Sequence, residues 1–282
     1  MKCIVIYNAS SGSALVKDAL LQKFSQNSIV VKKAIAVSPS LIETLHRTLK
    51  KDDVVAVVGG DGTIASCVSS IMHASAILAP LPGGTLNHLA KDVGVPSNLD
   101  EAIANLKKAR VRRIDVASVN DTYFLNNSSL GLYPTSLATR AHIEDKMGKW
   151  PAAVVGALRA FVRFRHYHIT IKNRDFTTPF VFIGNNRYRI KNVTSIERSS
   201  ITEGKLSIMM ITDCRRWDML VLLIRALFGR HRTSAAYKEF SASEITIFSK
   251  HKTMRISHDG ESAKLSSPLH YKIHAKQLRI LS

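Results

Sequence analysis

Hydrophobic runs alternate with helix-period segments through the first 118 residues of the chain. The runs typical of buried strands cover residues 2–7, 29–37, 54–58, 76–81 and 111–119. The helix-period segments lie near residues 15–24, 39–49, 64–72, 86–93 and 99–109. This alternation predicts a doubly wound parallel sheet, whose ligands bind beyond the carboxyl ends of the strands. Ser38 before Pro39 fits an N-cap residue followed by proline at the first helical position.

After residue 118 the pattern becomes mostly strand-like. The strand-like runs cover residues 168–172, 180–184, 205–212, 244–248, 253–257 and 269–274. Two helical segments, 149–168 and 215–232, interrupt them. We therefore expect an α/β domain over residues 1–118 and a mainly antiparallel β-sandwich or barrel over residues 119–282. The sequence leaves open whether the final strand packs back towards the first domain.

A glycine-rich turn follows the apolar strand 54–58 and reads Gly59-Gly60-Asp61-Gly62-Thr63. Such a turn lets backbone amides and a helix N-terminus approach an anion, and a nucleotide phosphate fits best. Asp61 would repel phosphate unless a divalent cation lies between them, so it predicts Mg²⁺. The alternative is a tight strand-to-helix turn in which Asp61 only caps the helix.

Two further loops follow other strands of the expected sheet. Asn8-Ala9-Ser10-Ser11-Gly12-Ser13 follows the first strand, and Pro82-Gly83-Gly84-Thr85-Leu86-Asn87-His88 follows the fourth. Either loop alone would be an ordinary turn more often than a binding site. Three loops of this kind at the carboxyl ends of strands in one sheet predict a composite nucleotide site.

A late motif, His258-Asp259-Gly260-Glu261, places two carboxylates around a glycine. A carboxylate on an exposed turn can act as the general base for a hydroxyl nucleophile. Asp-Gly is also a common hairpin turn, and from the sequence alone the hairpin is the favoured interpretation.

The formal net charge of the chain is +19, and the excess of Lys and Arg lies mostly after residue 117. Such a field attracts polyanions, either nucleic acid or an anionic membrane. Nucleic acid is disfavoured because no familiar nucleic-acid motif is present and aromatic residues make up only 7% of the chain.

Cellular location is indicated by what the chain lacks. Its three cysteines are scattered, which favours a reducing compartment. No signal-peptide pattern is visible, and no run approaches the roughly 18 apolar residues that span a bilayer. We expect a cytoplasmic protein.

These motifs together resemble the bacterial diacylglycerol kinase and lipid kinase family, which is related to eukaryotic diacylglycerol, sphingosine and ceramide kinases. The resemblance rests on Asn8 to Gly12, Gly59 to Thr63, Gly84 to His88, Asn126-Asn127 with Gly131, Glu203 to Leu206, Asp259 to Glu261 and Leu278 to Leu281. The glycine core around Asp61 is shared with NAD kinases and phosphofructokinases. The Gly-Thr-x-Asn loop and the late Asp-Gly-Glu narrow the resemblance to lipid kinases.

The resemblance implies an ATP- and Mg²⁺-dependent kinase that phosphorylates a lipid hydroxyl, with diacylglycerol as the first choice of acceptor. The first domain would bind ATP and the second the lipid. The implied ATP contacts are Asn8, Ala9, Ser10, Ser11, Gly12, Ser38, Gly59, Gly60, Asp61, Gly62, Thr63, Ile64, Ala65, Thr85 and Asn87. Asp259 or Glu261 would be the base. Besides Asp61, the implied metal site comprises Ser200, Glu203 and Lys205, the outer two through backbone carbonyls.

The chain departs from the family pattern at three positions. Ala9 stands where proline is frequent, Glu203 where aspartate is usual, and His88 where an aspartate often belongs to the metal network. An NAD kinase-like enzyme and a non-catalytic ATP-binding regulator stay open as alternatives.

The helical segments 149–168 and 215–232 combine apolar residues with flanking arginines, as in helices that lie at a membrane surface. Packing of these helices on their own sheet is the more frequent arrangement. We expect at least one of them to dock on an anionic membrane, which would make the protein peripherally membrane-associated. The sequence leaves formation of a homodimer open.

Overall fold

The computed structural model describes residues 1–8, 17–131, 166–192, 195–213, 215, 218 and 236–282. The chain forms two compact units. The first comprises Met1–Val116 with His274–Ser282, and the second comprises Ala117–Ile273. No helix in the described ranges is long and apolar enough to cross a bilayer.

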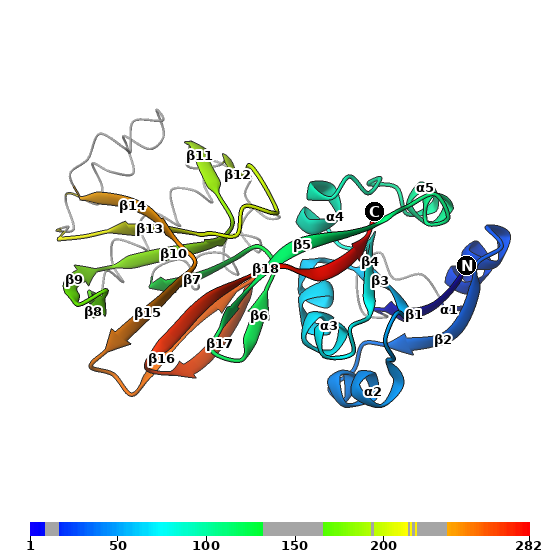
Figure 1. Cartoon of the computed structure of the whole chain (residues 1–282), viewed down its shortest axis with the longest axis horizontal. Helices are drawn as coiled ribbons and strands as arrows, with labels where there is room; N and C mark the ends of the chain where they lie inside the picture. Colours follow the sequence, from blue (N-terminus) through cyan, green and yellow to red (C-terminus); the bar gives the residue numbers. More distant parts are fainter. Residues whose placement is uncertain (9–16, 132–165, 193–194, 214, 216–217, 219–235) are drawn as a thin grey trace, which may run out of the picture. The chain divides into compact units, whose positions relative to one another are not determined.

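The first unit contains a parallel sheet in the order β2-β1-β3-β4-β18 (Figure 1). Its strands are β1 (Lys2–Tyr7), β2 (Val30–Ala36), β3 (Val54–Gly59), β4 (Ile77–Pro82) and the end of β18 (Leu269–Leu281). β3 and β4 are continuous apolar runs because both faces of a parallel sheet are covered. The strand order changes direction between β1 and β3, so the loops after these two strands border the usual ligand position of such a sheet.

Helices cover both faces of this sheet. They are α1 (Lys17–Gln26), α2 (Leu41–Thr48), α3 (Asp61–His73), α4 (His88–Asp92) and α5 (Leu99–Asn105). Leu20 and Phe24 of α1 pack with Ile103 of α5 against Val5 and Ala56, which point to one face of the sheet. α3 packs on β3 and β4 and contacts α2. The predicted doubly wound α/β domain is confirmed.

The second unit is an antiparallel sandwich. One sheet has the order β14-β13-β10-β7-β16-β17. Its strands are β7 (Asn127–Gly131), β10 (Phe180–Asn185), β13 (Leu206–Ile211), β14 (Tyr237–Ala242), β16 (Thr253–His258) and β17 (Glu261–Ser266). Side chains such as Val181, Ile208 and Ile256 point from this sheet into the unit's core.

The facing layer supplies the other side of that core, including Ile247 and Tyr271. In this layer β15 pairs with β8 and β18, β8 pairs with β9, and β5 pairs with β6 and β18. Its strands are β5 (Val111–Val119), β6 (Thr122–Phe124), β8 (Tyr167–Ile171), β9 (Arg174–Thr178), β15 (Glu244–Ser249) and the first part of β18. A separate hairpin joins β11 (Tyr188–Asn192) and β12 (Ser195–Arg198). The predicted sandwich is confirmed.

The predicted start of the second helix is wrong. α2 begins at Leu41, so Ser38 is not its N-cap residue and Pro39 is not its first residue. The Ser38 and Ser40 hydroxyls lie 3.2 Å apart, and the Leu41 amide donates to the Ser38 carbonyl at 3.0 Å. Residues 38–41 therefore form a turn before the helix.

Most of the two predicted helical segments, 149–168 and 215–232, lies outside the described residues. The end of the first is not helical, because β8 already begins at Tyr167.

Candidate active site

Two glycine turns, after the neighbouring strands β3 and β4, pack backbone against backbone. The Gly83 amide donates to the Gly59 carbonyl at 3.2 Å. A Cβ atom on Gly84 would lie 2.4 Å from Gly60 Cα, and one on Gly83 would lie 2.7 Å from the Gly59 nitrogen. Only residues without a side chain allow two backbones to approach this closely. The structure therefore brings together two of the three loops that the sequence assigns to the nucleotide.

Asp61 connects these two turns. It is the first residue of α3, and its carboxylate accepts hydrogen bonds from the amides of His88 and Leu89, both at 3.0 Å. It thus caps the start of α4 rather than its own helix. Each carboxylate oxygen has two lone pairs, and each uses one here. The other lone pairs can accept hydrogen bonds from the water shell of a cation.

Asn87 closes the second turn. Its backbone is left-handed, with φ 50°, a conformation that asparagine tolerates better than most residues. Its Oδ1 accepts from the Gly84 amide at 3.0 Å and its Nδ2 donates to the Gly84 carbonyl at 2.7 Å. The side-chain amide therefore holds the loop in shape. Thr85, at the tip, is exposed.

The remaining predicted nucleotide contacts are placed differently. Asn8 is half-buried at the end of β1, and Ser38 is exposed. The Ile64 side chain is fully buried and its amide donates to the Gly60 carbonyl at 3.1 Å, so neither group is open to a ligand. Thr63 packs on Gly59, where a Cβ would lie 2.6 Å from Thr63 Cβ. Gly62 and Ala65 are partly exposed, whereas Ala9, Ser10, Ser11 and Gly12 lie outside the described residues.

The late acidic motif forms the hairpin turn between β16 and β17. His258 pairs with Glu261, while Asp259 and Gly260 have φ values of 46° and 89°. Left-handed conformation at both central residues is characteristic of the Asp-Gly hairpin turn. The hairpin interpretation therefore describes the backbone correctly. The chemistry of the two carboxylates depends on the groups around each of them.

The Asp259 carboxylate is bound by three consecutive backbone amides. It accepts hydrogen bonds from Leu125 at 2.7 Å, Asn126 at 2.7 Å and Asn127 at 3.2 Å. The Asp259 amide in turn donates to the Asn127 carbonyl at 2.9 Å. These bonds attach the hairpin turn to the connection between β6 and β7. Asp259 therefore anchors the hairpin turn through contacts that the sequence does not reveal.

Glu261 differs from Asp259 in its surroundings. Its side chain is exposed, and among the described residues it has no hydrogen-bond partner. Burial lowers the pKa of the neighbouring His258, an effect that the Glu261 charge partly opposes. His258 Nδ1 is buried and, within the described part of the chain, without a partner. A neutral imidazole thus lies next to an exposed carboxylate.

The sequence analysis missed a set of buried polar residues behind this turn. Tyr188 donates its hydroxyl to the Asn126 carbonyl at 2.9 Å, and Asn185 Nδ2 donates to the Leu125 carbonyl at 2.8 Å. Asn185 ends the otherwise apolar strand β10 and Asn186 follows it, a signal that could have identified them. The Asn126 side chain is 7% exposed, and its Oδ1 has no partner among the described residues.

The implied metal loop precedes β13. The Glu203 amide donates to Asn186 Oδ1 at 2.9 Å, and Ser200 Oγ accepts from the Thr202 amide at 3.2 Å. The side chains of Glu203 and Lys205 are exposed. No group of three or more His, Cys, Asp or Glu side chains in the described ranges could hold a metal ion. A cation here would depend on backbone carbonyls with one carboxylate, a donor set that suits a hard ion such as Mg²⁺.

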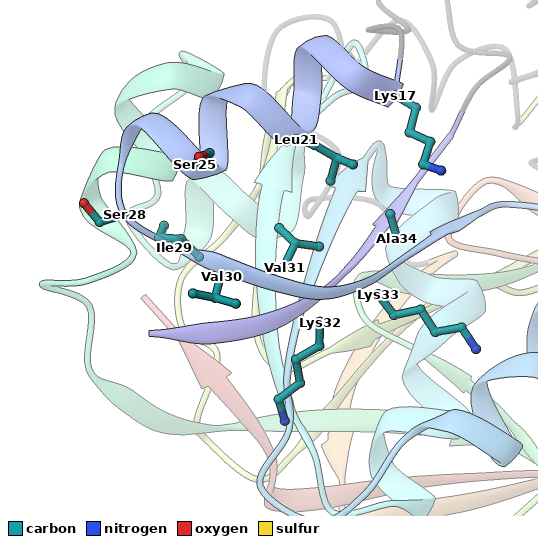
Figure 2. Close-up of a pocket in the computed structure, with 10 residues that line it drawn as sticks. All are labelled: Lys17, Leu21, Ser25, Ser28, Ile29, Val30, Val31, Lys32, Lys33 and Ala34. Atoms are coloured by element: carbon teal, nitrogen blue, oxygen red, sulfur yellow. The ribbon is translucent and has the colours of Figure 1, made fainter.

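A separate hollow of about 630 Å³ lies along α1 and the edge strand β2. Figure 2 shows Leu21 of α1 above Val31 of β2, with Lys17 and Lys33 towards one end. None of the residues that line it belongs to the predicted site. It therefore adds nothing to the nucleotide or base assignments.

Two family models match the chain. The diacylglycerol kinase catalytic domain matches residues 2–119, and the YegS C-terminal NAD kinase beta sandwich-like domain matches residues 134–282, more than half of the chain. The chain belongs to the YegS-like diacylglycerol kinase family. The predicted family and the prediction of a kinase are therefore confirmed at the level of the family.

Individual relatives agree with this assignment. A diacylglycerol kinase of Staphylococcus saprophyticus is 22% identical over 278 residues, which cover 91% of this chain and 88% of that protein. A candidate lipid kinase of Staphylococcus carnosus is 28% identical over 196 residues, or 62% of this chain and 64% of the relative. The chain thus spans slightly less than two thirds of the latter protein.

Solved structures share the fold. A crystal structure of a diacylglycerol kinase from Bacillus anthracis has a TM-score of 0.69 at 17% identity. A second structure from that organism has a TM-score of 0.75 at 20% identity. Both comparisons cover 99% of this chain and 96% of the other. At these identities the likeness concerns the fold alone.

Proposed function

We propose that this chain transfers the γ-phosphoryl group of ATP to a lipid hydroxyl, with Mg²⁺, and that diacylglycerol is the acceptor. The observation that carries the proposal is the pair of interlocked glycine turns at the ends of β3 and β4. Turns of this shape expose backbone to a phosphate chain, and Asp61 between them supplies the acidic group that a phosphate-bound cation requires.

In this proposal a bound Mg²⁺ would supply positive charge against the phosphate oxygens. Asp61 would hold it through water, because one lone pair on each oxygen already accepts an amide hydrogen bond. The loop of Ser200, Glu203 and Lys205 would hold a structural ion through carbonyl oxygens and the Glu203 carboxylate. Thr85 at the exposed loop tip and the backbone of Gly59 to Gly62 would contact the nucleotide.

Glu261 is proposed as the general base, and Asp259 as the residue that positions it. A base must have a free lone pair within reach of the acceptor hydroxyl. The three amide bonds to Asp259 use three of the four lone pairs of its carboxylate, whereas the exposed Glu261 carboxylate accepts no hydrogen bond from any described residue. The two carboxylates thus have different tasks in the same turn.

The test is phosphoryl transfer from γ-labelled ATP to diacylglycerol, sphingosine or NAD, with Mg²⁺ or with EDTA. We expect labelled diacylglycerol only with Mg²⁺, and a loss of about 10²–10⁴-fold in turnover for Glu261→Gln. Glu244→Gln is the matched control, because Glu244 is also an exposed glutamate at the start of a strand in the second unit. Labelled NAD, or full activity of Glu261→Gln, would overturn the proposal.

A further inference from the structure

The outer face of the β16–β17 hairpin carries two like charges directly opposite each other. Arg255 and Lys264 are cross-strand partners in the register, and both are exposed. Among the described residues, no ion pair or hydrogen bond engages either side chain. Like charges in this arrangement destabilise a sheet. The pair therefore does not stabilise the fold, and folding does not account for its presence.

The basic character continues to the end of the hairpin. Lys250, His251 and Lys252 form the exposed connection from β15 to β16, and the Lys252 carbonyl accepts a hydrogen bond from the Ser267 amide. From residue 245 to residue 276 the only acidic residues are Asp259 and Glu261, in the turn at the other end. A basic surface thus runs along the hairpin that carries the proposed base.

The remaining side chains on this face are small and polar. Because side chains alternate along a strand, Thr253 shares the face with Arg255, and Ser262 and Ser266 share it with Lys264. All three hydroxyl residues are exposed. The face offers cations and hydroxyl groups to phosphate oxygens and has no large apolar side chain that would insert among acyl chains. It also has no aromatic residue on which a nucleic-acid base could stack.

We propose that the outer face of this hairpin, the basic hairpin face defined by Arg255 and Lys264, docks on the anionic phospholipid headgroups of a membrane, with the exposed Lys250 and Lys252 adding positive charge at the end of the hairpin. The inference rests on the proposed function, since a lipid acceptor has to be reached at a membrane surface. The Arg255–Lys264 pair lies about four residues from the turn, or roughly 13 Å along an extended strand. Because side chains alternate along a strand, Glu261 lies on the opposite face from Lys264, so docking on this face anchors the hairpin turn beside the headgroups and leaves Glu261 pointing away from them.

The experiment measures sedimentation with phosphatidylcholine vesicles that contain or lack 30% phosphatidylglycerol. Each basic side chain near an anionic surface contributes about fivefold to binding, so Arg255→Ser with Lys264→Ser should weaken binding about thirtyfold. The matched control is Lys107→Ser with Lys108→Ser, which removes two exposed charges from the first unit. It should bind within about twofold of the parent protein.

Two further readouts separate docking from folding and from catalysis. Removing the like-charge pair should leave the Tm unchanged or raise it, and Lys250→Ser with Lys252→Ser provides a second weakened variant. Turnover of a short-chain, water-soluble diacylglycerol should be unchanged in both variants. The docking proposal would be overturned if the Arg255→Ser, Lys264→Ser variant bound vesicles as well as the parent protein does, or if the Lys107→Ser, Lys108→Ser control lost as much binding. It would also be overturned if the parent protein bound an oligonucleotide instead of vesicles. Failure to phosphorylate any lipid would overturn the proposed function alone, because vesicle binding is measured without turnover.

Discussion

Removing the charge of either carboxylate in the hairpin turn should reduce activity, but only removal at Asp259 should also reduce stability. Asp259→Asn keeps the shape of the side chain, and asparagine tolerates the left-handed backbone at φ 46°. The asparagine side chain has one acceptor oxygen in place of two, and its NH₂ group would face a backbone N–H, which is also a donor. The substitution therefore isolates the hydrogen bonds from the backbone geometry.

The magnitude follows from the three amide bonds, at 2.7, 2.7 and 3.2 Å. The asparagine oxygen can replace only part of them, and each backbone N–H left without an acceptor costs about 1–3 kcal/mol. We expect Asp259→Asn to lower the free energy of unfolding by about 3 kcal/mol, which corresponds to a fall in Tm of roughly 6–12 °C. Glu261→Gln, at an exposed side chain, should change it by less than about 0.5 kcal/mol.

The assay pairs calorimetric melting of both variants with the diacylglycerol kinase assay. Asp259→Asn should lose stability and activity together, whereas Glu261→Gln should lose activity with its Tm unchanged. Hydrogen exchange at Asn126 and Asn127 should accelerate only in Asp259→Asn. Equal stability of the two variants would refute the positioning role of Asp259, and an active Glu261→Gln would refute its role as the base.

Three other perturbations test the rest of the structure. Gly84→Ala should destabilise the first unit by about 2–4 kcal/mol in a thermal melt, because the new Cβ would lie 2.4 Å from Gly60 Cα. Gly60→Ala should be tolerated, because its Cβ would lie 3.4 Å from the nearest atom, Gly84 Cα. Asp61→Asn should cost about 1–3 kcal/mol and speed amide exchange at the start of α4, and unchanged exchange would argue against the cap. Burial lowers the pKa of His258 below its unfolded value of 6.5, so the unfolded chain binds the proton first as the pH falls. The free energy of unfolding, measured with denaturant between pH 7 and pH 5, should decrease as the pH falls below 6.5. It should decrease less in His258→Gln, and an equal decrease in both proteins would contradict the contribution of His258.

The sequence predicts strands best where both faces are buried. β3 and β4 are recognised as uninterrupted apolar runs, because the sheet around them is covered on both sides. β17 was missed because it is an edge strand with four exposed positions out of six and no clear hydrophobic pattern. β18 runs past residue 274 to Leu281 by pairing with β5 and β4, and within this part the Lys276 amide donates a hydrogen bond to Asp115 Oδ1 at 2.7 Å. That contact spans 161 residues and leaves no local pattern.

What the sequence determined by itself is local in origin. The glycine turns, the Asp-Gly hairpin and the alternation of apolar segments follow from backbone sterics and side-chain periodicity within a few residues. Only the tertiary structure decided which backbone amides donate hydrogen bonds to the carboxylates. Asp61 binds amides 27 and 28 residues away, and Asp259 binds amides 132 to 134 residues away. Hydrogen-bond partners this distant are selected by the folded path of the chain, so the difference in hydrogen bonding between the Asp259 and Glu261 carboxylates could not be predicted from the motif.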